Sequence, residues 1–250
     1  MEPLFQFLLR MGDNSLILGH RLSEWCGKAP VLEEDIALAN TALDLIGQTQ
    51  MWLGLAGEIE GQGRSADDLA MLRDVWDFRN VLLVEQPNGD FGQTIMRQFL
   101  FDAWHIEMLS ALKTSSHEQV AAIAEKASKE VAYHVERSAD TVIALGDGTE
   151  ESHQRMQNAL DLLWSFAGEL NQPDEIDAAL STEGVSPDLT QLKPVVENRI
   201  NQVLTEATLA IPDTTFAHKG GKSGFQHSEH LGHLLTQMQW LQRAYPGATW

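Results

Sequence analysis

Residues 102–134 read DAWHIEMLSALKTSSHEQVAAIAEKASKEVAYH and predict two consecutive helices joined by a short turn. On the first helix, apolar residues at steps of three and four place Asp102 among the core-facing positions. On the second helix, the same spacing makes His134 an inward residue and puts Val131 one turn before it. A carboxylate and a histidine are therefore expected inside one helical hairpin, with a valine at the position where a second carboxylate would complete a metal-binding motif.

The composition limits the class of protein. The chain has 250 residues and 43% hydrophobic content, enough to bury a core. Its 36 acidic and 17 basic residues give a formal net charge of −19, which repels nucleic acid and anionic membranes. The single cysteine, Cys26, agrees with a reducing compartment and is expected to be at least half-buried. The apolar stretch over residues 1–9 is too short for a membrane span, so we expect a soluble cytoplasmic protein with no nucleic-acid or membrane partner.

Helical periodicity runs through almost the whole sequence and predicts an all-α fold. Four long helices are expected near residues 5–26, 33–58, 91–112 and 118–145, and outer helices near 152–170, 189–209 and 228–243. A shorter helix near 66–83 makes one connection long, and two antiparallel pairs joined by one long crossover are typical of a ferritin-like four-helix bundle. We therefore expect a single ferritin-like domain over residues 1–250, with its core bundle at about 5–145 and additional helices at about 150–245.

A ferritin-like bundle that holds two irons needs a Glu on each of two helices and a Glu-x-x-His motif on each of the other two. In this sequence a glycine, Gly47, stands where the motif that begins at Asp44 requires its histidine, and glycine cannot bind a metal. Iron pairs need anionic oxygens, so the sequence predicts a degenerate site that binds no metal. The positions of this degenerate site are Asn14, Asp44, Gly47, Asp102, Val131 and His134.

Buried carboxylates are costly unless they are paired or hydrogen-bonded. Arg21 shares a helix stripe with Asn14 and is the candidate positive partner for Asp44 and Asp102. Three interpretations stay open: a buried polar network left from a metal site, ordinary carboxylates on helix surfaces, and a working metal site. For His134 the alternative is a hydrogen-bonded core histidine.

Three blocks of sequence carry a resemblance to a known family. The blocks are LSEWCG at 22–27 with IALAN at 36–40 and DLIGQ at 44–48; LLVEQPNG at 82–89 with DAWH at 102–105; and GGKSG at 220–224 with HSEHLG at 227–232 and PG at 246–247. Over its full length the chain resembles the C subunits of bacterial 1,2-phenylacetyl-CoA epoxidases, which are multicomponent di-iron monooxygenases.

The resemblance implies a non-catalytic structural subunit that pairs with a catalytic A subunit of similar fold in aerobic phenylacetate breakdown. It implies no cofactor bound by this chain, because the iron pair is expected in the A subunit and NADPH is expected to act through a separate reductase. Two other functions stay open: an oxidase or oxygenase with an atypical ligand set, and a helical binding protein unrelated to oxygen chemistry. We expect an outer stripe of the first hairpin to contact the catalytic subunit, and this stripe contains Leu38, Leu45, Thr49 and Trp52.

A glycine-rich segment before the last helix gathers positive charge in this acidic chain. It contains Lys219, Lys222, His227 and His230. These groups suit the phosphates of a coenzyme A tail or an acidic loop of a partner, and the alternative is a capping or interface loop. Ser228 is expected to cap the last helix.

Overall fold

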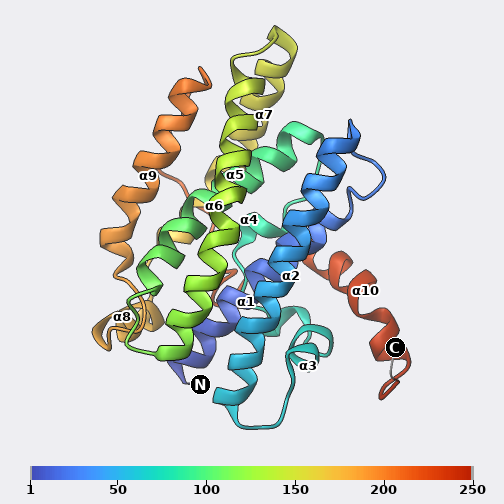
Figure 1. Ribbon diagram of the computed structural model, residues 1–250, viewed down its shortest axis with the longest axis vertical. Coiled ribbons are helices and arrows are strands. Elements are labelled where there is room, and N and C mark those ends of the chain that lie inside the picture. Colours follow the sequence, from blue (N-terminus) through green and yellow to red (C-terminus); the bar gives the residue numbers. More distant parts are fainter. Residues whose placement is uncertain (1, 249–250) are drawn as a thin grey trace. The chain divides into compact units, whose positions relative to one another are not determined.

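The computed structural model describes residues 2–248, and this part of the chain contains ten α-helices, two short 3-10 helices and no strand (Figure 1). The all-α fold expected from the helical periodicity is confirmed. Contacts divide the chain into two compact units, one formed by Met1–Pro87 with Lys219–Trp250 and the other by Asn88–His218. Each unit is built around one of the two predicted helical hairpins.

The first unit contains α1 (Pro3–Ser23), α2 (Leu32–Glu60), α3 (Ala66–Met71), the 3-10 helix η1 (Val75–Asp77), α4 (Leu82–Glu85) and α10 (Glu229–Ala244). The second unit contains α5 (Phe91–Leu112), α6 (Glu118–Gly146), α7 (Glu150–Ala167), the 3-10 helix η2 (Gly168–Asn171), α8 (Glu175–Thr182) and α9 (Leu189–Glu206). The four hairpin helices begin and end within about one turn of their expected bounds. None of the described helices is long and apolar enough to cross a lipid bilayer.

Close packing of α1 against α2 builds the core of the first unit. Two glycines of α1 allow this approach. A Cβ atom on Gly12 would lie 2.5 Å from Leu53 Cδ2, and one on Gly19 would lie 3.3 Å from the carbonyl oxygen of Ala42. A larger residue at Gly12 would therefore push the two helices apart.

The α2 stripe that we expected to contact a partner protein belongs to this core instead. Leu38, Leu45, Thr49 and Trp52 are each at most 4% exposed. The Thr49 hydroxyl donates to the carbonyl oxygen of Gly12 on α1, 3.4 Å away. The prediction was wrong because α2 is apolar on both faces, so its periodicity does not reveal which face packs on α1.

The connection after α2 is not the single helix expected over residues 66–83, since α3 covers only the first part of that range. In the loop that follows, the backbone N–H of Arg79 donates to the Asp13 carboxylate, 2.8 Å away. The backbone N–H of Val81 donates to the Asn14 side-chain oxygen, also at 2.8 Å. Because side chains of α1 accept these hydrogen bonds, the loop satisfies its backbone without continuing the helix.

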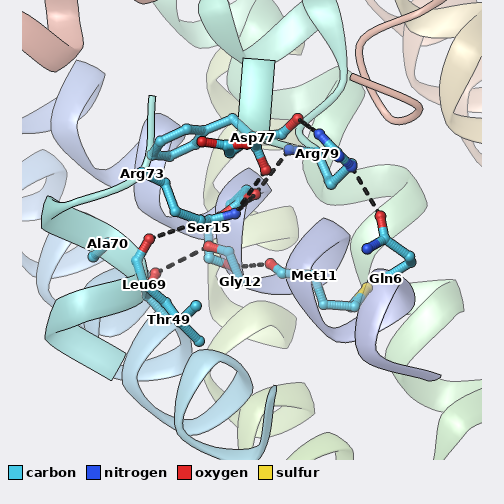
Figure 2. A network of polar contacts seen from close by, with 12 residues as sticks. Gln6, Met11, Gly12, Ser15, Thr49, Leu69, Ala70, Arg73, Asp77 and Arg79 are labelled. Atoms are coloured by element: carbon cyan, nitrogen blue, oxygen red, sulfur yellow. Dashed lines mark hydrogen bonds and ion pairs between the residues drawn. The ribbon is translucent and has the colours of Figure 1, made fainter. Parts of the chain in front are cut away.

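A buried ion pair between Arg73 and Asp13 fastens this loop to α1. Their side chains are 4% and 0% exposed, and the Arg73 guanidinium donates to both carboxylate oxygens of Asp13, one of them at 3.0 Å. Arg73 also donates to the carbonyl oxygens of Leu69 and Asp77 (Figure 2). Its guanidinium carbon lies 4.4 Å from the centre of the Phe78 ring. The buried guanidinium of Arg73 is therefore held by one carboxylate, two carbonyl oxygens and one aromatic ring.

In the second unit, α7 and α9 pack against the hairpin of α5 and α6. The short helix α8 was not expected from the sequence, and it begins where the Asp174 carboxylate accepts the backbone N–H groups of Ile176 and Asp177. The Ser115 hydroxyl, in the turn between α5 and α6, donates to the carbonyl oxygen of Val185 at 2.7 Å. This bond fastens the segment after α8 to the hairpin turn.

Cys26 is exposed, and the expectation that it is at least half-buried was wrong. Helix α1 ends at Ser23, so Cys26 lies in the turn that follows and outside the core. A single exposed thiol still agrees with a reducing compartment.

We expect Asp13→Asn to lower the free energy of unfolding by about 3 kcal/mol or more, because Arg73 would keep a buried charge without its counterion. Arg73→Met is expected to cost a similar amount for the converse reason. Urea unfolding at neutral pH, followed by circular dichroism, measures both effects.

The matched control is Arg155→Ala, which removes exposed ion pairs with Glu151 on α7 and with Asp90 at the start of α5. Exposed pairs of this kind contribute little, so the control should cost less than about 1 kcal/mol. If Asp13→Asn is no more harmful than Arg155→Ala, the buried pair does not fasten the crossover.

Candidate functional site

A fully buried carboxylate, Asp102, is the centre of a polar cluster between α5 and α6 in the second unit. The Gln98 amide nitrogen donates to Asp102 Oδ1 at 2.7 Å, and both residues lie on α5 one turn apart. The Ser138 hydroxyl on α6 donates to Asp102 Oδ2 at 2.9 Å. Both carboxylate oxygens therefore accept hydrogen bonds from neutral side chains.

Burial raises the pKa of Asp102 from 3.8 to about 6, because an apolar interior disfavours the charged carboxylate. The nearby charges of His134 and Arg137 and the hydrogen bonds from Ser138 and Gln98 act in the opposite direction, but they offset burial only in part. The Asp102 carboxyl thus exchanges its proton close to physiological pH.

His105 is a second buried member of this cluster, one turn after Asp102 on α5. Its ring lies fully inside the core, 5.0 Å from the Phe101 ring and 6.0 Å from the Trp104 ring between centroids. Neither ring nitrogen has a hydrogen-bond partner among the described residues. Burial, and next the charge of His134, lower the pKa of His105 to about 3, so this imidazole is neutral.

The spacing of the α5 residues contained the signal for His105. Gln98, Asp102 and His105 stand at positions i, i+4 and i+7, which share one face of a helix. This polar run faces the buried side of α5 and was only partly identified from the sequence.

The donor set of this cluster does not fit an iron pair. His134 and Val131 are buried on α6 as predicted, at 2% and 0% exposure. At the Val131 position the cluster is lined by an apolar side chain, and the oxygens of Asp102 are already used by Gln98 and Ser138. Among residues 2–248, no group of three or more His, Cys, Asp and Glu side chains is arranged to hold a metal ion.

Two of the predicted positions in the first unit serve the crossover. Asn14, 3% exposed, accepts the Val81 backbone N–H described above. Arg21 donates to the Glu24 carboxylate at 2.9 Å and to the backbone carbonyl oxygen of Glu85 at 2.7 Å. These contacts join the end of α1 to the end of α4.

Asp44 and Gly47 were expected inside the core, and this was wrong. Asp44 is half-buried and Gly47 is exposed, whereas the neighbouring Gln48 is fully buried. The helical period explains the difference, because the core face of α2 is defined by Leu38 and Leu45 and Gly47 lies nearly opposite to it.

A second buried carboxylate, Glu85, fastens the segment over residues 219–230 to the rest of the first unit. The sequence pattern did not indicate a role for this residue. His227 Nδ1 lies 2.6 Å from Glu85 Oε1, and both side chains are at most 1% exposed. The backbone N–H and the hydroxyl of Ser228 donate to Glu85 Oε2 at 2.7 Å and 2.6 Å. The Asn80 amide donates to Glu85 Oε1 at 2.9 Å.

These contacts correct the expectations for two residues of this segment. His227 is an internal anchor rather than a residue that reaches a partner. Ser228 stands at the N-cap of α10, but its hydroxyl is bonded to Glu85 and makes no capping hydrogen bond. Lys219 is exposed, and Lys222 and His230 are half-buried.

The titrations of Asp102 and His105 should have opposite effects on stability. Between about pH 4 and about pH 6 an unfolded Asp102 has lost its proton and the folded one keeps it, so this group lowers stability as pH rises. An unfolded His105 is protonated below pH 6.5 and the folded one is not until about pH 3, so this group raises stability as pH rises.

Relative to the unmodified chain, Asp102→Asn should therefore gain up to about 3 kcal/mol of stability as pH rises from about 4 to about 6. His105→Phe should lose stability over the same range. Urea unfolding at several pH values measures both differences, at low protein concentration because this acidic chain is least soluble there. Two differences of the same sign would contradict the assignment of these groups.

Comparison with known proteins identifies the family of the chain. The family model described as phenylacetic acid catabolic protein matches residues 1–250. The C subunit of the 1,2-phenylacetyl-CoA epoxidase of Escherichia coli (strain K12) is 48% identical to the chain over 250 residues, which covers 100% of both proteins. From this full-length match we conclude that the chain belongs to the phenylacetic acid catabolic protein family.

Proposed function

We propose that this chain is a non-catalytic structural subunit of a cytoplasmic phenylacetyl-CoA epoxidase, in which it pairs with and supports the catalytic di-iron A subunit. The family and the 48% identity to the C subunit of an epoxidase support the assignment to this complex. We infer the absence of catalysis from the Asp102 cluster. Its hydrogen bonds and the apolar side chain of Val131 occupy the interior between α5 and α6.

The same cluster argues against an oxidase or oxygenase with an atypical ligand set. Two iron ions need several anionic oxygens to offset their charge. The described interior of the α5–α6 hairpin offers one carboxylate, Asp102, and both of its oxygens already accept hydrogen bonds from Gln98 and Ser138. The imidazole of His105 is a neutral donor and supplies no compensating charge.

We propose that the two hairpins form a ferritin-like bundle. The order of the elements supports it, because two hairpins of long helices are joined by one long connection through α3, η1 and α4. In this proposal the whole chain is one ferritin-like domain, and Asn14, Arg21 and Asp102 are remnants of a metal-site interior now used for hydrogen bonding.

The cofactors of the reaction then belong to other subunits. The iron pair is expected in the A subunit, and electrons from NADPH are expected through a reductase. For this chain we propose a contact role for the segment over residues 219–230, whose lysines Lys219 and Lys222, with the hydrogen-bonding His230, suit an acidic loop of a partner or the phosphates of coenzyme A.

The test is metal analysis of the chain purified alone, together with reconstitution. We expect substoichiometric iron in the isolated chain, and epoxidase activity only when the A subunit and the reductase are added. Asp102→Asn should leave the activity of the reconstituted complex unchanged, because the carboxylate binds no metal. An iron pair in the isolated chain that Asp102→Asn and His134→Ala both remove would overturn the proposal.

A further inference from the structure

Helix α2 carries an exposed apolar stripe on the side opposite the core of the first unit. The stripe consists of Leu32, Ile36, Leu43 and Ile46, which are 71%, 53%, 66% and 36% exposed. Their steps of four, seven and three residues place them on one face of the helix. Four large apolar side chains aligned in this way mark an interaction surface rather than scattered exposure.

The same face continues toward the end of α2 with small residues. A Cβ atom on Gly47 or on Gly54 would meet nothing within 4 Å. A helix laid along the stripe therefore finds room to approach the backbone of α2, and the apolar side chains provide the area to bury.

The charges on α2 decide which kind of protein fits this surface. Between Leu32 and Glu60 the helix contains six acidic residues and no lysine or arginine. Glu33 and Glu58 are exposed beside the stripe. A second copy of this chain would place these carboxylates against one another, and like charges facing across an interface are unfavourable. The occupant is therefore a different protein whose apolar helix is flanked by Lys or Arg.

We propose that the exposed stripe of α2, formed by Leu32, Ile36, Leu43 and Ile46, is the docking surface for the catalytic subunit of the epoxidase, which presents an apolar helix flanked by basic residues. This inference rests on the proposed function and adds the location and the charge of the contact. It also replaces the expectation from the sequence, which placed the contact on the buried stripe of Leu38, Leu45, Thr49 and Trp52.

The experiment measures the Kd between the full chain and the A subunit of the same organism by biolayer interferometry. Leu43→Lys and Ile36→Lys should each weaken binding by about tenfold or more, because each places a charge in the apolar contact. Glu58→Lys should slow association, and high salt should slow association of the unmodified chain, because the flanking charges attract the partner.

The matched control is Leu162→Lys on α7, since Leu162 and Ile36 are both 53% exposed. Binding by this variant should be unchanged. All variants replace exposed side chains, and circular dichroism checks that each one is folded.

The possible results separate the two proposals. If the unmodified chain does not bind the A subunit, the proposed function fails and this inference fails with it. If it binds and Leu43→Lys binds equally well, the docking surface lies elsewhere and only this inference is overturned. Self-association of the unmodified chain that Leu43→Lys abolishes would assign the stripe to a second copy. If α2 beyond Leu43 is strongly protected from hydrogen exchange in the isolated chain, and Leu43→Lys loses this protection, the exposed stripe belongs to an internal contact.

Discussion

The buried pair of Arg73 and Asp13 is the constraint on which the first unit depends. Removing both charges from water is costly, and the cost is met only because Arg73 also donates to two carbonyl oxygens and Asp13 also accepts the Arg79 backbone N–H. The fixed loop then places Glu85, and Glu85 holds His227 and Ser228. The position of the C-terminal helix α10 thus follows from an aspartate near the start of the chain.

The second unit solves the problem of a buried carboxylate differently. Among the described residues, neutral donors from Gln98 and Ser138, rather than an arginine, donate hydrogen bonds to Asp102. Burial raises the pKa of Asp102 to about 6, so a proton neutralises this carboxyl only once the pH falls below about 6. His105 stays uncharged over the same pH range. Such a network is satisfied by hydrogen bonds from the protein's own side chains.

The sequence predicts those parts of the fold that depend on local pattern. The bounds of α5, Phe91 to Leu112, were predicted because its apolar period is regular and Asp90 caps its first turn. The crossover was expected, but its conformation was not predicted, because it is set by Asp13 and Asn14, more than sixty positions earlier. The burial of Glu85 was equally inaccessible, since its partner His227 lies 142 positions away. Within the candidate site, the apolar stripes of α5 and α6 predicted Asp102 and His134, and only contacts in space revealed the role of Ser138.

Helix α2 explains why the sequence alone assigns the contact surface to the wrong side. A helix with apolar stripes on two opposite faces gives no direction from its sequence, and both stripes satisfy the helical period. The structure removes the ambiguity because α1 covers only the stripe of Leu45 and Trp52 and leaves that of Leu43 exposed. A protein that acted alone would gain solubility from polar residues there. An exposed apolar face with acidic flanks is instead the composition expected of a surface that contacts another protein.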